Sequence, residues 1–239
     1  MPVLGVNLMR VWQPINGWRA FAGEVGVIVL GVLIALVLGA IANEVGWRFE
    51  VAKARAQIRD EISLNFSLLG IHEKAAPCVA QRLDTIGAIM AEASRTGKLP
   101  PLAPLGSAPA ALWPRGIWES QLAAQTIAHY PAREAAGLSR VYRRFQAFAE
   151  NDSETQDAWD VLSMLAGPGR RLDPESEGRL YAALAQARRS NSQTRRRAAG
   201  ARQLLAETLG ADYPRSAGAK PVVTGNTCDR ISGAIPPTY

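Results

Sequence analysis

The chain has 239 residues, of which 48% are hydrophobic and 20% charged, and its formal net charge at pH 7 is +6. This length is enough for a membrane anchor plus one modest domain. The chain has 2 histidines and 2 cysteines, a composition that disfavours metal centres and Cys–His nucleophiles.

An uninterrupted apolar run near the N-terminus is the strongest pattern in the sequence. Residues 25–42 carry no charged side chain. A helix of that length, at 1.5 Å per residue, nearly matches a hydrocarbon core of about 30 Å. Trp18 precedes the run and Trp47 follows it, and amphipathic rings favour the headgroup zone. We predict an N-terminal interfacial segment over 1–23 and a transmembrane helix over 24–46.

The same run permits a second interpretation, a cleavable export signal. Ala40, Ile41 and Ala42 form the small-residue pattern that precedes signal cleavage. Cleavage at Ala42 would release an exported soluble helical protein. The leader would be long for a signal peptide, and Glu24 stands at the start of the apolar run. A buried core helix is less favoured, because soluble core helices usually carry a polar side.

Small residues gather on one side of the predicted span when it is projected at 100° per residue. Lipid gives no hydrophobic drive to helix association, so close backbone approach must supply the attraction. We therefore predict that this side docks against another helix, from a second copy or from another membrane subunit. A proton-relay role for the carboxylate at its edge is a less favoured alternative. The predicted docking face consists of Glu24, Gly31, Ala35, Gly39, Ala42 and Gly46.

Helical periodicity continues after the span, with apolar residues at three-, four- and seven-residue intervals. Gly70 and Pro77 are expected to interrupt this helix, with Pro77 in the first turn of a second helix that ends near Gly97. Residues 98–116 contain five prolines, which favour an extended strap over the bundle rather than a helix.

Helical patterns resume after the strap, and Pro131 marks a new helix start. Asp173 followed by Pro174 is typical of a helix N-terminus, and the last helix is expected to end near Gly210. The sequence thus predicts an all-α fold. Its single N-terminal transmembrane helix continues into a helical bundle domain over 47–210, followed by an irregular C-terminal tail over 211–239.

The two cysteines, Cys78 and Cys228, are candidates for one disulfide in an oxidising compartment. Closing so long a loop can stabilise a fold by up to roughly 5 kcal/mol. The count of basic residues around the span leans toward a cytoplasmic domain. The cysteine pair and the Ala-x-Ala pattern lean the other way, and we expect the bulk of the chain to be periplasmic.

A stretch rich in arginine is the other candidate site. Its charge would attract anionic headgroups or an acidic protein. No aromatic residues interleave with it, so nucleic acid is not an expected partner. His72 and His129 do not show zinc-site spacing with the cysteines, and no catalytic motif is present, so we expect no enzyme activity and no cofactor. The predicted basic patch consists of Arg188, Arg189, Arg195, Arg196, Arg197 and Arg202.

Four segments resemble those of an uncharacterised bacterial family of single-pass membrane-anchored proteins. They are the Glu-led run 24–65, CVAQRLDTI at 78–86, IWESQLAAQTIAHYP at 117–131, and 138–165. Members of the family begin with a Glu-led span of Gly-Val-Leu-Ile-Ala-Leu type. The chain departs from the commoner version in the Val-Leu-Gly-Ala that follows Leu36. The resemblance, over about two-thirds of the chain, implies a proteobacterial envelope protein of unknown function and lends no activity.

These patterns together predict a non-enzymatic, single-pass protein of the bacterial inner membrane. It would act as an accessory or scaffolding subunit of a larger membrane assembly. The expected partners are the lipid bilayer and other membrane subunits, or a second copy through the span. The alternative is a membrane-anchored sensor whose helical bundle binds a small ligand.

Overall fold

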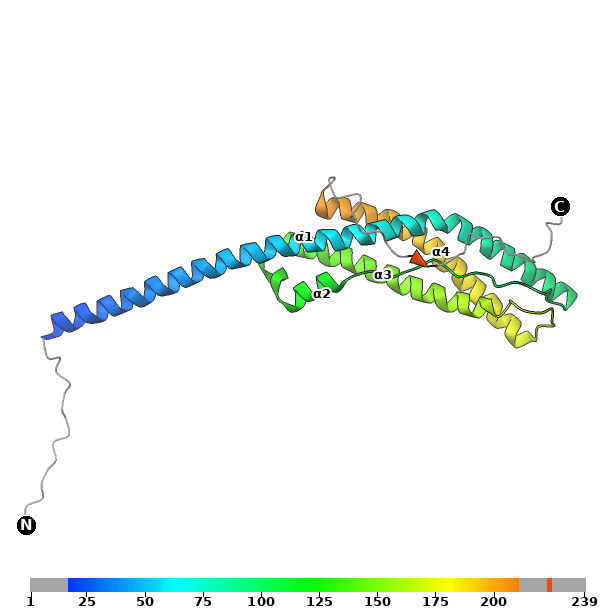
Figure 1. The fold of residues 1–239 in the computed structure, drawn as a ribbon, viewed down its shortest axis with the longest axis horizontal. Coiled ribbons are helices and arrows are strands. Elements are labelled where there is room, and N and C mark those ends of the chain that lie inside the picture. Colours follow the sequence, from blue (N-terminus) through cyan, green and yellow to red (C-terminus); the bar gives the residue numbers. More distant parts are fainter. Residues whose placement is uncertain (1–16, 211–222, 225–239) are drawn as a thin grey trace, which may run out of the picture. The chain divides into compact units, whose positions relative to one another are not determined.

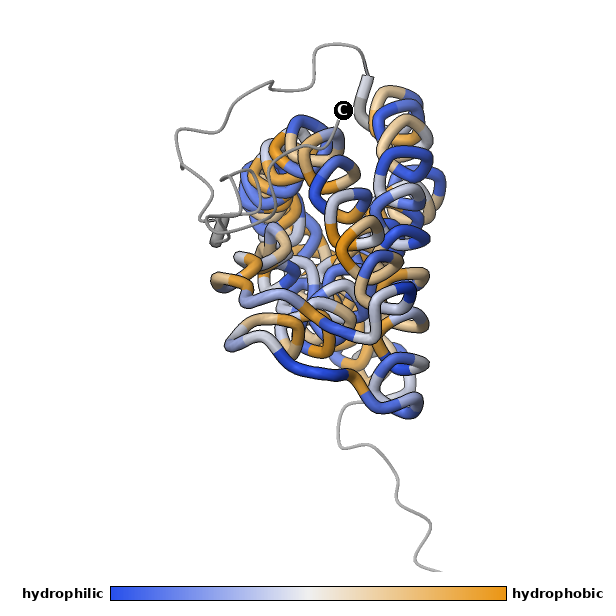
Figure 2. Tube along the Cα trace, turned by 90° about the vertical axis from the view of Figure 1, so that its right-hand side faces the viewer, coloured by the Kyte–Doolittle hydropathy of each residue, from blue (hydrophilic) through white to orange (hydrophobic). Residues whose placement is uncertain are grey.

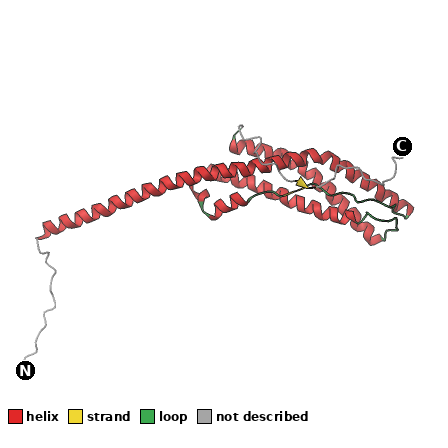
Figure 3. Ribbon diagram, in the orientation of Figure 1, coloured by secondary structure: helices red, strands yellow, loops and turns green. Residues whose placement is uncertain are grey.

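The computed structural model describes residues 17–210 and 223–224, and this part of the chain is almost entirely helical (Figures 1 and 3). The all-α prediction is therefore confirmed. Most of the predicted interfacial segment and most of the predicted tail lie outside the described residues. The elements in chain order are α1 (Gly17–Thr96), β1 (Ala110–Ala111), α2 (Gly116–Ala123), the short 3₁₀ helix η1 (Thr126–His129), α3 (Ala132–Ser163), α4 (Pro174–Leu209) and β2 (Val223–Thr224).

The chain divides into two compact units, with the boundary between Glu50 and Val51. The first unit contains the apolar part of α1. It includes an 18-residue window that is long and apolar enough to cross a membrane, and no part of that window is buried within the protein. The second unit is a helical domain, and it holds the residues that form the buried core.

Helix α1 continues through Gly70 and Pro77, so the predicted interruption there is wrong. Proline inside a helix removes one backbone hydrogen bond and costs about 3 kcal/mol. Here α1 buries apolar side chains on both sides of the proline, Leu69 before it and Leu83 after it. Packing on both sides offsets the local cost. The helix ends at Thr96, and the next residue, Gly97, has φ +66°. This is the left-handed cap that the sequence predicts.

Helices α1 and α3 run in parallel within the domain. Tyr142 Oη donates to Glu61 Oε1 at 2.7 Å, and about three turns further on His72 of α1 lies beside Asp152 of α3. Both residue numbers rise together, as they must for parallel neighbours. Parallel neighbours require a connection that returns along the bundle.

Helix α4 runs antiparallel to both. Against α1, Arg188 pairs with Asp84 and Arg202 pairs with Glu73, so the numbers rise on one helix and fall on the other. Asp173 caps the N-terminus of α4, where its carboxylate accepts from the Ser176 backbone at 2.9 Å. This helix start is as the sequence predicts.

The proline-rich strap, residues 98–116, is the connection that returns along the bundle. It forms little regular structure, so its backbone groups need other partners. Side chains of α1 supply several of them. Arg82 Nη1 donates to the Leu105 carbonyl at 3.0 Å, and Asn65 Nδ2 donates to the Pro114 carbonyl at 2.8 Å. The backbone of Leu99 also exchanges hydrogen bonds with Arg170, and that of Leu102 with Gly167. The strap thus takes the place of a fourth helix and is held by side chains and backbone groups together.

Buried Glu61 organises the start of α2. Its carboxylate accepts hydrogen bonds from the backbone N–H groups of Ile117 at 2.8 Å and Trp118 at 3.1 Å. The third donor is the Tyr142 hydroxyl. A helix N-terminus carries partial positive charge and unpaired N–H groups, so a carboxylate stabilises it. Glu61 therefore performs from α1 the capping role that no residue of α2 supplies.

The core of the domain has two apolar clusters. One includes Ile62, Phe145 and Phe148, and the other includes Ile86 and Leu162. On each of the three long helices, buried polar residues stand between members of the two clusters. Figure 2 shows polar and apolar positions mixed along each helix. We call this set the polar layer: His72, Asn151, Asp152, Thr155, Ser190 and Thr194.

Candidate functional site

The predicted docking face lies entirely on the first unit of α1, and its residues are exposed. A Cβ atom added to Gly31, Gly39 or Gly46 would meet nothing within 4 Å. At Gly137 of α3, in contrast, an added Cβ would lie 2.5 Å from Thr208 Cγ2 of α4. Gly137 therefore serves the packing of the domain, whereas the glycines of the apolar segment serve no contact among the described residues.

Large apolar side chains surround this face and are also exposed. Val27 is 72% exposed, Ile28 65% and Leu36 64%. Such exposure along a whole helix would be unfavourable in water by about 25 cal/mol per Å² of apolar area. The segment therefore needs an apolar environment, from lipid or from other helices.

Two arginines of the predicted basic patch pair with α1. Arg188 Nη2 lies 2.9 Å from Asp84 Oδ1. Arg202 Nε lies 3.1 Å from a carboxylate oxygen of Glu73, and its guanidinium stacks over the Phe66 ring at 4.5 Å. These two side chains tie α4 to α1, so part of their charge is already compensated inside the domain.

The other four arginines of the patch have mixed environments. Arg197 Nη1 donates to the Ala147 carbonyl of α3 at 3.2 Å. Arg189 and Arg196 bond to side chains of their own helix. Arg195 is exposed and has no partner among the described residues. The six arginines therefore do not all present one exposed face, although they are close in sequence.

An exposed basic surface, which the sequence did not predict, lies instead on α3. Arg133, Arg140, Arg143 and Arg144 are all exposed, and none has a hydrogen-bond or ion-pair partner among the described residues. We call these four residues the α3 arginine surface. Their spacing of three and four residues places the last three side chains close together on the helix.

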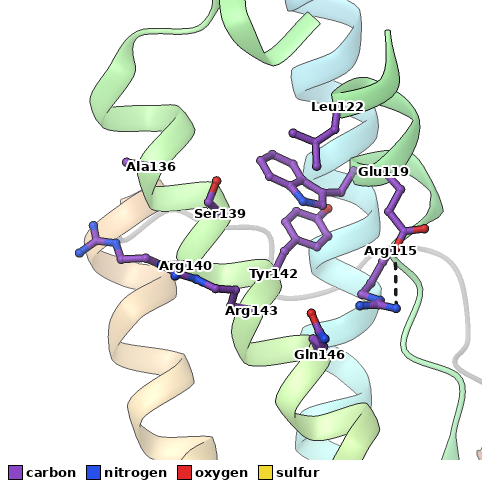
Figure 4. Close-up of a pocket in the computed structure, with 10 residues that line it drawn as sticks. Arg115, Glu119, Leu122, Ala136, Ser139, Arg140, Tyr142, Arg143 and Gln146 are labelled. Atoms are coloured by element: carbon purple, nitrogen blue, oxygen red, sulfur yellow. Dashed lines mark ion pairs between the residues drawn. The ribbon is translucent and has the colours of Figure 1, made fainter. Parts of the chain in front are cut away.

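A hollow of about 600 Å³ opens beside this surface, between α2 and α3 (Figure 4). Its aromatic wall is the stacked pair Trp118 and Tyr142, whose ring centroids are 4.8 Å apart. Arg140 and Arg143 line it from α3, and across from them Arg115 lies 3.6 Å from Glu119. The hollow therefore combines an aromatic wall with cationic groups.

A second hollow of about 590 Å³ opens on the other side of the same arginines, between α3 and α4. Arg140 and Arg143 line this hollow too, and Arg144 joins them. One carboxylate, Glu207, lines it, and that side chain already accepts a hydrogen bond from Gln203 at 2.9 Å. The arginines thus stand on a ridge between two concave surfaces.

The polar layer contains the most strongly perturbed titratable groups. Trp113 Nε1 of the strap donates to Asp152 Oδ2 at 2.8 Å, and the Ala111 backbone donates to the same carboxylate. His72 Nε2 lies 3.4 Å from that oxygen but makes no hydrogen bond. Nearby, Asn151 Nδ2 donates to Thr194 Oγ1 at 3.0 Å. The layer therefore joins α1, the strap, α3 and α4.

Burial changes the ionisation of both members of the His72–Asp152 pair. It raises the pKa of Asp152 to about 7, although the hydrogen bonds from Trp113 and Ala111 act in the opposite direction. Burial lowers the pKa of His72 to about 4. Both shifts favour the uncharged form, as expected where charged groups lose their hydration. Because burial shifts the pKa of both groups, each member of this pair makes the stability of the domain depend on pH.

Cys78 is on α1, next to Pro77, and the described part of the chain contains no free cysteine. Its predicted partner Cys228 lies outside the described residues. Of the two histidines, His72 is in the polar layer and His129 ends η1, so the structure does not bring them together with Cys78 as one ligand set. Among the described residues, no group of three or more His, Cys, Asp or Glu could hold a metal ion.

No protein-family model, curated protein or solved structure matches this chain.

Proposed function

We propose that this protein is a non-enzymatic, single-pass subunit of a bacterial inner-membrane assembly, with its helical domain in the periplasm. The main support for this proposal is the apolar part of α1, which is long and apolar enough to span a bilayer and has no part buried within the protein. Its glycines face no contact among the described residues, although small residues at four-residue spacing permit close helix approach. A docking role in the membrane accounts for both features.

The docking face can be tested with a matched pair of alanine substitutions. Ala35 lies on the predicted face, whereas Ala40 lies about 140° away around the helix at 100° per residue. We expect Ala35→Leu to reduce association about tenfold, equivalent to about 1.4 kcal/mol, because the added side chain keeps the backbones apart. The measurement is the recovery of a second, differently tagged copy and of stoichiometric partner subunits after purification in mild detergent.

Ala40→Leu is the control, since it adds the same atoms on the other side of the helix. It should leave recovery unchanged. Equal loss from both substitutions, or from neither, would reject the docking face. Recovery of a chain that begins after Ala42 and is soluble without detergent would instead favour the exported soluble protein.

The periplasmic location and the Cys78–Cys228 disulfide can be tested together. The absence of a free cysteine in the described part of the chain supports the pairing, because the sequence has 2 cysteines. We expect wild type to resist thiol alkylation under denaturing conditions until it is reduced. Cys228→Ser should expose Cys78 to alkylation without reduction. A C-terminal alkaline phosphatase fusion should be active, because that enzyme requires export.

Two alkylatable thiols in unreduced wild type would reject the disulfide. An inactive phosphatase fusion paired with an active cytoplasmic reporter at the same position would place the domain in the cytoplasm.

A further inference from the structure

The acidic side chains near the α3 arginine surface accept hydrogen bonds from other residues and not from its arginines. Glu134 accepts from Arg55 through both oxygens, at 2.9 and 2.7 Å. Glu150 accepts from Gln146 at 2.9 Å. Arg188 and Arg202 show that arginines of this domain do find carboxylates where packing provides them. None of the four arginines of the α3 arginine surface forms an ion pair with a carboxylate of the described residues.

Such a cluster carries a local cost, since like charges three and four residues apart repel each other on a helix. Arg140, Arg143 and Arg144 have this spacing. A ligand with concentrated negative charge would remove the repulsion. The guanidinium group binds phosphate through two parallel hydrogen bonds, which a lysine cannot do.

The two hollows indicate what else the ligand would contact. Arg140 and Arg143 border both hollows, so an anion bound to them has concave surface on either side. Beside them, Leu122 is 48% exposed and the Trp118–Tyr142 pair forms an aromatic wall. A molecule that joins a phosphate to an apolar part matches this arrangement better than a purely polar anion does.

The covalent link to the apolar segment favours a lipid over an acidic protein as the occupant. Arg55 is in the first turns of the domain, directly after the apolar segment in the sequence, and its ion pair with Glu134 fixes the start of α3 beside it. If the apolar segment spans a bilayer, the chain tethers the domain to the lipid, so headgroups are present around the domain at a high effective concentration. Basic residues close to a membrane surface are attracted to anionic lipids.

We propose that the α3 arginine surface binds the phosphate groups of anionic phospholipid headgroups, with Arg140 and Arg143 as the central contacts. The inference rests on the membrane anchoring proposed above and adds a second, peripheral attachment to the lipid.

The test uses the full chain in a zwitterionic detergent and measures binding of short-chain phosphatidylglycerol by thermophoresis. We expect phosphatidylglycerol to bind at least about tenfold more tightly than short-chain phosphatidylcholine, and to weaken as salt is raised. Arg140→Gln combined with Arg143→Gln should weaken binding about tenfold, because the variant lacks both central guanidinium groups.

The matched control is Arg171→Gln combined with Lys74→Gln, which removes the same charge from exposed basic residues whose side chains have no described partners. It should leave lipid binding within about twofold of wild type, because it changes the net charge but keeps Arg140 and Arg143. Equal weakening by both double variants would overturn the proposal.

Two further probes separate the alternatives. Inorganic phosphate that competes as well as the lipid would overturn lipid binding in favour of a site for a free anion. A glutamate-rich peptide that binds while phosphatidylglycerol does not would overturn it in favour of an acidic protein. Because Ala35→Leu should not affect lipid binding in detergent, failure of this test and failure of the docking face are distinguishable.

Discussion

Trp113→Ala should lower the free energy of unfolding of the helical domain by about 4 kcal/mol, within the range measured for large aromatic residues in cores. The indole is 5% exposed and stacks on Phe148 with ring centroids 5.1 Å apart. Its N–H also donates to Asp152, so truncation leaves a buried carboxyl with one donor fewer. Both effects act at the point where the strap meets α3.

The measurement is denaturant unfolding of the full chain in mild detergent, followed by circular dichroism. Leu112→Ala is the control. Leu112 directly precedes Trp113 and is 85% exposed, so its truncation should change the free energy of unfolding by less than about 0.5 kcal/mol. Trp113→Phe should fall between them, since it keeps a ring but loses the donor. If Trp113→Ala and Leu112→Ala differ by under about 1 kcal/mol, the strap is not anchored as described.

The pH dependence of stability should change sign between two variants of the polar layer. Folded Asp152 has a pKa of about 7 against its ordinary 3.8, so the folded state keeps a proton that the unfolded state releases. This group's contribution is full below about pH 4 and is lost as pH rises toward 7. Folded His72 has a pKa of about 4 against its ordinary 6.5, so its contribution is lost as pH falls from 6.5 to 4.

The two effects oppose each other in wild type and should largely cancel between pH 4 and 6.5. Asp152→Asn leaves only the histidine, so the free energy of unfolding should rise by up to about 3 kcal/mol from pH 4 to 6.5. His72→Asn leaves only the carboxyl, so it should fall by up to about 4 kcal/mol from pH 4 to 7. Both side chains are at least nine-tenths buried, so solvent screens these effects little.

Denaturant unfolding at several pH values checks both slopes. Asn151→Ala serves as the control, because it disturbs the same layer without removing a titratable group and should keep the flat profile of wild type. Slopes of the same sign in Asp152→Asn and His72→Asn would contradict the assignment.

Local signals in the sequence predicted helix ends well. Asp173 before Pro174 and Gly97 after α1 act through their own backbone and nearest neighbours, so a short window contains the whole cause. The interruption predicted at Pro77 is wrong because the cost of the proline is local, whereas the compensating burial comes from helices far along the chain. The all-α class followed from periodicity, which reports burial directly.

The polar layer could not be found from the sequence, because its members are spread over three helices. His72 and Asp152 look like ordinary polar positions until the parallel packing of α1 and α3 brings them together. The α3 arginine surface was not predicted for a related reason. Charge counting along 187–202 cannot show that Arg188 has its carboxylate on α1, whereas the arginines of α3 have none described.

The polar layer also has a consequence for how the domain can rearrange. Sliding any one helix by a single turn, about 5.4 Å, would carry its polar groups into one of the flanking apolar clusters. A shift of α3 would also take Asp152 away from its donors in the strap, Trp113 and Ala111, and a buried polar group without a hydrogen-bond partner is strongly destabilising. The polar layer thus fixes the axial alignment of the three long helices. A force along the helices of the domain would therefore displace the domain as a whole or unfold it, and would not shift one helix past another.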